Sequence, residues 1–168
     1  RGKALRFLPG QHVTLTLSEG ETISLPIASC PCNAQALEFH LVNELSSNNV
    51  QNNLITKILN LADKRQRISI TGPYGNFTLS ATTHKPKIFI ACGGDFSQLQ
   101  SMLEHLMNSD LGAPVCLIWQ ATAQTGHYRS NLCRSWHDAI DEFSFVPIVV
   151  GSVPLASLSS TWFDKLDR

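Results

Sequence analysis

The sequence predicts two domains of different fold class, an α+β unit followed by an α/β unit. Over residues 1–83, apolar and polar residues alternate in short runs, which is typical of strands with one buried face. Over residues 84–168, continuous apolar runs are separated by segments of helical spacing, which is typical of a parallel sheet covered by helices. We therefore expect a small antiparallel β-barrel and then a parallel three-layer αβα domain.

The first unit is expected to contain short strands and one helix. The alternation predicts strands over 12–17, 23–28, 37–41, 68–70 and 77–79. Gly72-Pro73-Tyr74-Gly75 should stop the strand at 68–70, because glycine and proline interrupt regular pairing. Apolar residues recur at helical spacing from Leu54 to Leu59, after a polar stretch rich in helix-capping residues, so a helix is expected there.

The second unit is expected to follow a β-α-β-α-β order. Continuous apolar runs predict its strands over 88–92, 115–119 and 145–150. Two apolar stripes at helical spacing predict the helices between them, one through Leu99, Met102, Leu103 and Leu106, the other through Leu132, Trp136 and Ile140. In such open parallel sheets, ligands bind at the carboxyl ends of the strands.

The composition narrows the possible partners. The chain has 168 residues, with 13 Lys and Arg against 13 Asp and Glu, so its formal net charge is zero. This balance gives no electrostatic attraction to nucleic acid or to an anionic membrane. The longest apolar runs are much shorter than the roughly 20 residues of a bilayer-spanning helix. We therefore expect neither a nucleic-acid nor a membrane partner and, since no signal peptide is visible, a cytoplasmic protein.

The five cysteines are interpreted as reduced thiols. Cys92 and Cys116 lie inside apolar runs, where a thiol acts as a small hydrophobic side chain. An odd number of cysteines favours a reducing compartment and no disulfide framework. Cys30-x-Cys32 lies in a proline-rich turn and could form a metal or redox pair. It has no second pair at zinc spacing, so an ordinary loop is favoured.

A second group of possible metal ligands is also interpreted as structural. Cys133 and His137 are one helical turn apart, and His127 precedes them. These side chains could approach a metal ion, but a partly exposed helix face is the simpler interpretation. The sequence therefore predicts no metal site, and it assigns no catalytic side chain.

A candidate ligand site follows the strand at 88–92. That strand leads into Gly93-Gly94-Asp95-Phe96-Ser97, and a helix follows. Glycine allows a ligand to approach the backbone closely, and the first turn of a helix presents unpaired N–H groups and a positive dipole end. A phosphate or a polar ring could bind there, although a Gly-Gly pair after a strand is also common in a plain tight turn.

Several segments together resemble one family. Pro9-Gly10-Gln11-His12-Val13 is similar to a PGQ-x-V strand, and Ile27-Ala28-Ser29 to the end of an R-x-[YF]-S-[IL]-A-S motif. Gly72-Pro73-Tyr74-Gly75-Asn76-Phe77 matches a G-P-x-G-x-F turn, and the segment from Cys92 to Leu103 is similar to a G-G-T-G-x-[AS]-P-x-x-S-[MI] loop and helix. In this order and spacing, the segments resemble the ferredoxin–NADP reductase superfamily, and within it the NAD(P)H:flavin oxidoreductases of the Fre and LuxG type.

The resemblance implies a flavin, FAD or FMN, that lies across the β-barrel, and NAD(P)H that binds on the second domain and passes hydride to the flavin. It implies a small-molecule flavin and nicotinamide as partners, and a redox protein as a further possible partner. Carried over by position, the expected cofactor-binding residues are Leu25, Pro26, Ile27, Ala28, Ser29, His40, Leu41, Val42, Gly93, Gly94, Asp95 and Ser97.

The sequence departs from the family at positions that bind cofactor. Ile23, Leu25 and Pro26 stand where the motif has Arg, an aromatic residue and Ser, so charged, stacking and hydroxyl contacts are lost. Asp95 replaces the family's Thr-Gly, and its carboxylate should cap the following helix and repel a dinucleotide phosphate. We therefore expect micromolar or weaker flavin binding, and poor binding of NAD(P)H.

Two functions remain open at this point. The first is a flavin-linked oxidoreductase that transfers hydride between NAD(P)H and a flavin, as a flavin reductase or as an electron-transfer module. The second is a catalytically degenerate relative that keeps the fold as a binding or scaffold module. Compared with the family, strands are expected to be missing before Pro9 and after Val150, so the second domain is expected to be incomplete.

Overall fold

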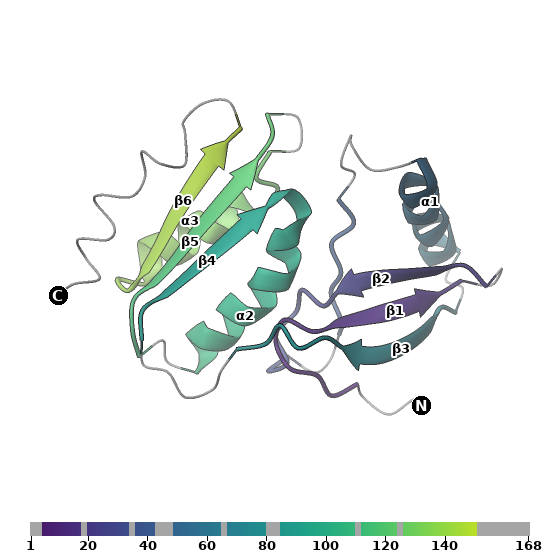
Figure 1. The fold of residues 1–168 in the computed structure, drawn as a ribbon, viewed down its shortest axis with the longest axis horizontal. Coiled ribbons are helices and arrows are strands. Elements are labelled where there is room, and N and C mark those ends of the chain that lie inside the picture. The colour runs from purple at the N-terminus through teal and green to yellow at the C-terminus, as the bar shows by residue number, and fades with distance from the viewer. Residues whose placement is uncertain are drawn as a thin grey trace. The chain divides into compact units, whose positions relative to one another are not determined.

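The computed structural model describes residues 5–17, 20–33, 36–42, 49–64, 67–79, 85–109, 112–123 and 126–150. The chain forms two compact units, Arg1–Ala81 with Gly94–Asp110 and Thr82–Gly93 with Leu111–Arg168. An antiparallel three-stranded sheet is followed along the chain by a parallel three-stranded sheet with helices (Figure 1). This order confirms the predicted fold class, with a partial second domain. The predicted boundary near residue 83 stays a prediction.

The first sheet is built on β1, which lies between two antiparallel neighbours. β1 (His12–Thr16) pairs with β2 (Thr22–Pro26) on one side and with β3 (Ser69–Tyr74) on the other. In β1 and β2, alternate residues are buried, as the alternating sequence predicts. The buried residues form one core cluster: Val13, Leu15, Leu17, Ile23, Leu25, Ile27 and Ile58.

The helix predicted near Leu54–Leu59 is present and is longer than predicted. α1 spans Asn49–Asp63 and brings Ile58 into the core of the sheet. Leu54 and Leu61 pack against the same cluster, at spacings that place them on the same face of the helix as Ile58. The amphipathic pattern therefore sets which face of α1 is buried.

The strand predicted at 68–70 does not stop at Gly72-Pro73. β3 continues to Tyr74, and its pairing with β1 shifts register between His12 and Thr14. β3 is an edge strand, where a proline without an N–H is tolerated. Gly72 has φ +141°, and a Cβ there would lie 3.2 Å from Val13 Cγ1, so this glycine allows a close strand crossing.

Two predicted strands, at 37–41 and 77–79, are wrong. Residues 36–42 and 77–79 have no regular strand pairing, although the Ala28 N–H donates a hydrogen bond to the Glu38 carbonyl over 2.9 Å. Leu37, Phe39 and Leu41 pack partly buried against the core of the first unit. Their alternation with polar residues therefore reflects one-sided burial of an extended segment, which does not require a hydrogen-bonded ladder.

Helix α2 (Phe96–Asn108) belongs to the first unit and is anchored to it by side chains. A short 3₁₀ turn, η1 (Gly93–Asp95), leads from β4 into this helix. Ser101 Oγ donates a hydrogen bond to the Ser29 carbonyl over 2.8 Å, and the Gln98 amide donates to the Gly10 carbonyl. Gly10 has φ +95° and directly faces Met102, so a side chain at this position would collide with the helix.

The second unit contains a parallel sheet in the order β4-β5-β6. Its strands are β4 (Lys87–Cys92), β5 (Val115–Ala121) and β6 (Phe143–Val149), which match the three predicted apolar runs. The central strand β5 is largely buried. α3 (Ser130–Ala139) packs against β6, and the Trp136 and Phe143 rings meet edge to face at 5.9 Å.

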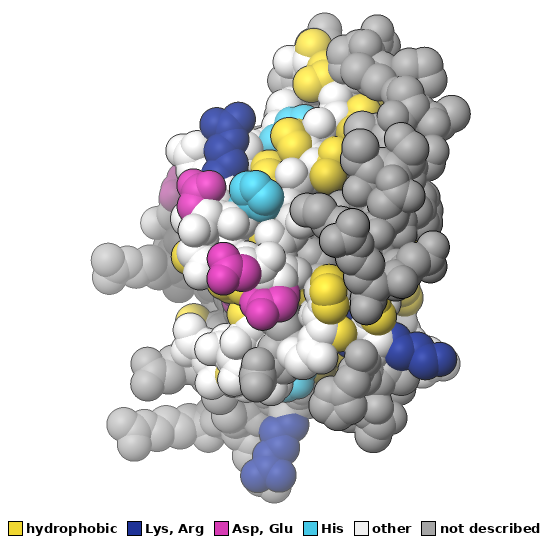
Figure 2. Space-filling model, turned by 90° about the vertical axis from the view of Figure 1, so that its left-hand side faces the viewer, with side chains coloured by type: hydrophobic (Ala, Val, Ile, Leu, Met, Phe, Trp, Pro, Cys, Tyr) yellow, Lys and Arg dark blue, Asp and Glu magenta, His cyan; other side chains and the backbone are white. Residues whose placement is uncertain are grey.

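In the described part of the chain, none of the helices is both long and apolar enough to cross a bilayer. On the face shown in Figure 2, the coloured Lys and Arg side chains stand apart from one another, with Asp, Glu, His and apolar side chains between them.

Candidate functional site

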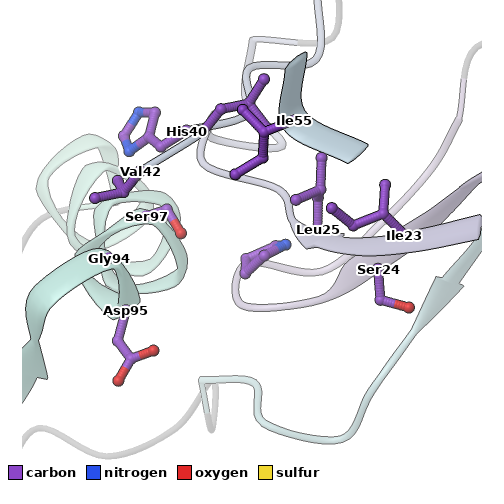
Figure 3. Close-up of a pocket in the computed structure, with 11 residues that line it drawn as sticks. Ile23, Ser24, Leu25, His40, Val42, Ile55, Gly94, Asp95 and Ser97 are labelled. Atoms are coloured by element: carbon purple, nitrogen blue, oxygen red, sulfur yellow. The ribbon is translucent and has the colours of Figure 1, made fainter. Parts of the chain in front are cut away.

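A pocket of about 220 Å³ lies within the first unit. Three parts of the chain form it: the end of β2, the extended segment after His40, and the turn that enters α2, with one residue from α1 (Figure 3). The lining residues are Ile23, Ser24, Leu25, Pro26, His40, Leu41, Val42, Ile55, Gly94, Asp95 and Ser97.

Part of the lining of this pocket consists of apolar side chains. Ile23 and Leu25 come from the buried alternation of β2, and Ile55 comes from α1 (Figure 3). Leu41 and Val42 complete the apolar part of the lining. These side chains offer contact to an apolar face of a ligand, because its burial removes apolar surface from water.

Polar groups enter the pocket from the start of α2. Gly94, Asp95 and Ser97 line it where η1 runs into the helix. The predicted cap at Asp95 is wrong: Asp95 occupies the N-cap position, but its side chain makes no capping hydrogen bond. The backbone of Asp95 is already helical, with φ −61° and ψ −18°, because η1 continues directly into α2. A capping side chain needs the extended backbone that this turn does not provide.

His40 is the one basic side chain among the lining residues. Its Nε2 lies 3.1 Å from Glu38 Oε1, and only 7% of the His40 side chain is exposed. This contact with Glu38 holds the imidazole ring in place. In Figure 3, the Asp95 carboxylate points away from His40, so the two ionisable groups of the lining lie apart.

The structure brings most of the predicted cofactor-binding residues to this pocket and leaves four out. Leu25, Pro26, His40, Leu41, Val42, Gly94, Asp95 and Ser97 line it, whereas Ile27, Ala28, Ser29 and Gly93 do not. Ile27 and Ala28 are fully buried. Ser29 is held by two hydrogen bonds: its Oγ accepts one from the Glu38 N–H, and its carbonyl accepts one from the Ser101 hydroxyl. The Gly93 carbonyl, in the second unit, accepts the Trp119 indole N–H over 3.0 Å.

Three lining residues were not among the cofactor-binding candidates from sequence: Ile23, Ser24 and Ile55. Ile23 was noted only as a departure from the family's motif. Ser24 lies on β2 between Ile23 and Leu25, so its neighbours in the motif could have indicated it. Ile55 gives no such signal, since it is one of several apolar residues on an amphipathic helix. Only the packing of α1 against the sheet brings it to the pocket.

The cysteine prediction is wrong in one respect. Cys30 and Cys32 form a disulfide, whereas Cys92, Cys116 and Cys133 are free thiols. Composition could not show this pairing, because it depends on a local turn. Burial raises the pKa of Cys116 to about 11 and that of Cys133 to about 12, so both stay neutral thiols near pH 7. Among the described residues, no cluster of three His, Cys, Asp or Glu could hold a metal ion.

Comparisons of sequence link the chain to reductases. No family model matches it. It is 24% identical over 155 residues to the Comamonas "terephthalate 1,2-dioxygenase, reductase component 1", covering 91% of this chain and 44% of that protein. It is 24% identical over 144 residues to the "NAD(P)H-flavin reductase" of Aliivibrio fischeri, covering 85% of this chain and 61% of that protein. The chain thus spans about half the length of the relatives that it matches.

Comparisons with solved structures also find similarity to reductases. The chain superposes on a cytochrome P450 reductase from Amycolatopsis with a TM-score of 0.74 at 19% identity, covering 88% of this chain and 44% of that one. It superposes on a variant of Plasmodium falciparum ferredoxin-NADP+ reductase with a TM-score of 0.65 at 15% identity, covering 89% of this chain and 59% of that one. The chain therefore has the ferredoxin–NADP+ reductase fold and is similar in sequence to flavin reductases and oxygenase reductase components, as its motifs indicate.

Proposed function

We propose that the pocket of the first unit binds the ring system of a flavin, and that the chain is part of a flavin-linked oxidoreductase. The observation that carries the proposal is the pocket itself, which gathers the end of β2, residues 40–42 and the start of α2. The relatives named as flavin reductases and reductase components support the same chemistry. In such a protein the flavin, when bound, accepts hydride from NAD(P)H and passes electrons on.

The residues present fit a flavin ring. The cavity of about 220 Å³ is smaller than the roughly 300–1,000 Å³ of sites that enclose whole drug-sized ligands, so it suits a ring whose remaining part extends outward. Ile23, Leu25 and Ile55 offer apolar contact. His40 and Ser97 offer hydrogen bonds to the polar edge of a ring.

The residues present fit a flavin phosphate less well. Among the described residues of the lining there is no Lys or Arg, and Asp95 places a carboxylate at its edge. Charge-assisted hydrogen bonds from such side chains to a phosphate contribute about 1.5–3 kcal/mol each, and this contribution is missing here. We therefore propose micromolar or weaker affinity, carried by the ring. The choice between FMN and FAD depends on groups outside this pocket.

In this proposal the chain's residues bind the flavin ring, orient it and exclude water from part of it. The apolar side chains of the lining keep solvent from one part of the ring, and the contact with Glu38 holds the His40 ring at a fixed position beside it. Pro26 offers only its carbonyl, since it has no N–H and no hydroxyl. No side chain of the lining is assigned a covalent role.

Binding of NAD(P)H is the least supported part of the proposal. Asp95 replaces the expected Thr-Gly, and Gln120-Ala121-Thr122 at the end of β5 carries no arginine. These residues do not fit a dinucleotide phosphate, so we propose no step through a bound nicotinamide here. A redox-protein partner and a cytoplasmic location likewise stay proposals, the first supported by the relatives named as reductase components.

A flavin titration tests the proposal. Quenching of flavin fluorescence is measured with riboflavin, FMN and FAD, and NAD(P)H oxidation is followed in the same samples. We expect micromolar binding of all three flavins, because they share the ring. Binding without NAD(P)H oxidation would favour the alternative, a catalytically degenerate binding module. No binding of any flavin would overturn the assignment of the pocket.

A further inference from the structure

A local turn holds the sulfur atoms of Cys30 and Cys32 together. The two residues form a disulfide, with their Cα atoms 5.1 Å apart, which is within the usual range for such a bond. The Asn33 N–H donates a hydrogen bond to the Cys30 carbonyl over 3.0 Å, which closes a four-residue turn. Pro31 occupies its second position, where the fixed φ of proline favours a turn. The backbone alone therefore keeps the two sulfurs close.

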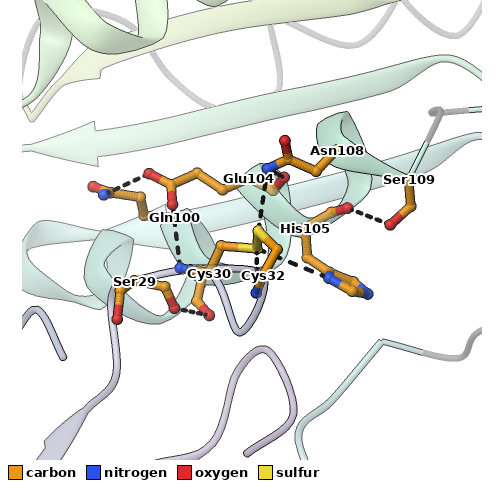
Figure 4. Close-up of a disulfide and its surroundings, with 9 residues drawn as sticks. Ser29, Cys30, Cys32, Gln100, Glu104, His105, Asn108 and Ser109 are labelled. Carbon is orange, nitrogen blue, oxygen red and sulfur yellow. Dashed lines mark hydrogen bonds between the residues drawn. A yellow bond between two sulfur atoms is a disulfide. The ribbon is translucent and has the colours of Figure 1, made fainter. Parts of the chain in front are cut away.

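The two sulfur atoms differ in accessibility. Cys30 is 2% exposed, whereas Cys32 lies exposed on the surface of the first unit. Asn108 Nδ2 donates a hydrogen bond to Cys32 Sγ over 3.2 Å, which fixes the position of the exposed sulfur (Figure 4). A thiol from solution can therefore reach Cys32 and not Cys30.

The buried sulfur has groups that stabilise a departing thiolate. The Cys32 N–H donates to Cys30 Sγ over 3.1 Å, and His105 Nδ1 lies 3.9 Å from the same atom (Figure 4). N–H groups that point at a sulfur favour its anionic form. When Cys32 is attacked, Cys30 is the sulfur that departs, and these groups stabilise its thiolate.

The turn is also anchored by bonds that do not involve sulfur. The Cys30 N–H donates to Glu104 Oε2 over 3.2 Å, and the Ser29 carbonyl accepts Ser101 Oγ–H over 2.8 Å. Glu104 is itself held by the Gln100 amide over 2.9 Å. Because these contacts survive reduction, the two thiols should stay adjacent and able to close again.

We propose that Cys30 and Cys32 form a reversible thiol–disulfide exchange site that low-molecular-weight thiols enter through Cys32. A thiolate RS⁻ attacks Cys32 Sγ, the Cys30–Cys32 bond breaks, and Cys30 leaves as a thiolate that takes up a proton. A second RS⁻ attacks the mixed disulfide at the sulfur of R, releases RS–SR, and leaves Cys32 as a thiolate that also takes up a proton. Two thiols are oxidised and one disulfide is reduced, so two electrons are transferred. This site is independent of flavin binding.

The first experiment equilibrates the full chain with mixtures of reduced and oxidised glutathione, then alkylates free thiols and locates them by peptide mass spectrometry. We expect Cys30 and Cys32 to gain and lose their label together and reversibly as the ratio changes. Cys116 and Cys133, which are buried, should stay unlabelled in the folded protein. The proposal is overturned if Cys30 and Cys32 remain unpaired at every ratio, or if either pairs with another cysteine.

The second experiment separates the two sulfurs in a Cys92→Ser background, which removes the other exposed thiol. With Cys30→Ser, the remaining Cys32 should form a mixed disulfide with oxidised glutathione about tenfold or more faster than Cys30 does with Cys32→Ser. His105→Leu should slow reduction of the intact disulfide several-fold, whereas His137→Leu on α3 should not. Equal rates for the two single cysteines would overturn entry through Cys32.

Discussion

The two ends of helix α2 have different surroundings in the first unit. At its start, Gly94, Asp95 and Ser97 line a pocket with short side chains and backbone. Toward its end, Glu104 and Asn108 make specific hydrogen bonds to the Cys30–Cys32 turn. One end therefore lines the pocket, whereas the other end is bonded to the protein's own chain.

This difference shows which parts of the helix can change without loss of the fold. The Asp95 side chain makes no capping bond, so the start of the helix does not depend on this side chain as a cap. The middle and end of the helix are fixed by Ser101, Glu104 and Asn108. Both ends rely on the same close packing of Met102 against Gly10.

The largest effect is expected where the helix meets Gly10. A Cβ at this position would collide with Met102 Cε and with the Phe77 carbonyl, and φ is +95°. Gly10→Ala should therefore lower the free energy of unfolding by about 3 kcal/mol, through backbone strain and overpacking together. Urea denaturation followed by circular dichroism measures this change.

Gly20→Ala is the matched control for this variant. Gly20 also has a positive φ, +83°, but a Cβ there would meet nothing within 4 Å. Only the conformational cost remains, about 1 kcal/mol. Equal losses in the two variants would show that the contact of Gly10 with α2 contributes nothing.

The sequence predicts the sheets of the two units better than the segments between them. Val13, Leu15, Ile23 and Leu25 alternate because one face of the sheet is buried, and the structure has strands there. The same alternation at Leu37, Phe39 and Leu41 gives no strand, since periodic burial does not reveal whether a neighbouring strand is present to pair. The register shift at β3 likewise depends on tertiary pairing.

The second prediction concerns the buried thiol of Cys133 in the second unit. Burial raises the pKa of Cys133 from 9.0 to about 12, whereas an unfolded chain ionises this thiol near pH 9. Above pH 9 the unfolded state therefore binds fewer protons, and stability falls as the pH rises toward 12. The loss should be about 1 kcal/mol for each pH unit above 9. Well below pH 9 this thiol is protonated in both states, so it adds no pH dependence to the free energy of unfolding.

Urea midpoints between pH 7 and 10.5 check this expectation. Cys133→Ala removes the titrating group, so its stability should depend less steeply on pH above 9 than that of the unsubstituted chain. The difference between the two curves isolates Cys133 from lysines and tyrosines that titrate in the same range. Parallel curves for the two proteins would contradict the buried-thiol explanation.

The third prediction tests the apolar wall of the pocket. Ile55→Asn replaces a lining side chain by a polar one of similar size and should weaken flavin binding about fivefold, or about 1 kcal/mol, because apolar contact with the ring is lost. Leu59→Asn is the control on the same helix, since Leu59 is 52% exposed and does not line the pocket. Its effect on flavin affinity should be less than twofold. Fluorescence titration with riboflavin measures both.

The lining of the pocket could be predicted only where it follows from motif positions along the chain, and Ile55 is the exception. Pro26, His40 and Gly94 follow from motif positions along the chain, and the pocket contains them. Ile55 enters only because α1 packs over the sheet, which no local pattern indicates. Ile27 and Ser29 were expected at the pocket and are instead buried beside it, where they hold the backbone in place.

The smallest effect is expected at Asp95, at the pocket end of α2. Its carboxylate makes no capping bond, so Asp95→Asn should cost about 0.3–1 kcal/mol of stability, the attraction of the helix dipole for a negative charge. The described lining residues include no Lys or Arg, so removal of this negative charge should relieve repulsion of a ligand phosphate. FMN affinity should therefore rise about two- to threefold at low salt and less at high salt, as expected for a partly screened charge. Riboflavin has the same ring without the phosphate, so its affinity should not change. An equal gain for riboflavin and FMN would show that Asp95 acts on the ring, and would place the phosphate away from the start of α2.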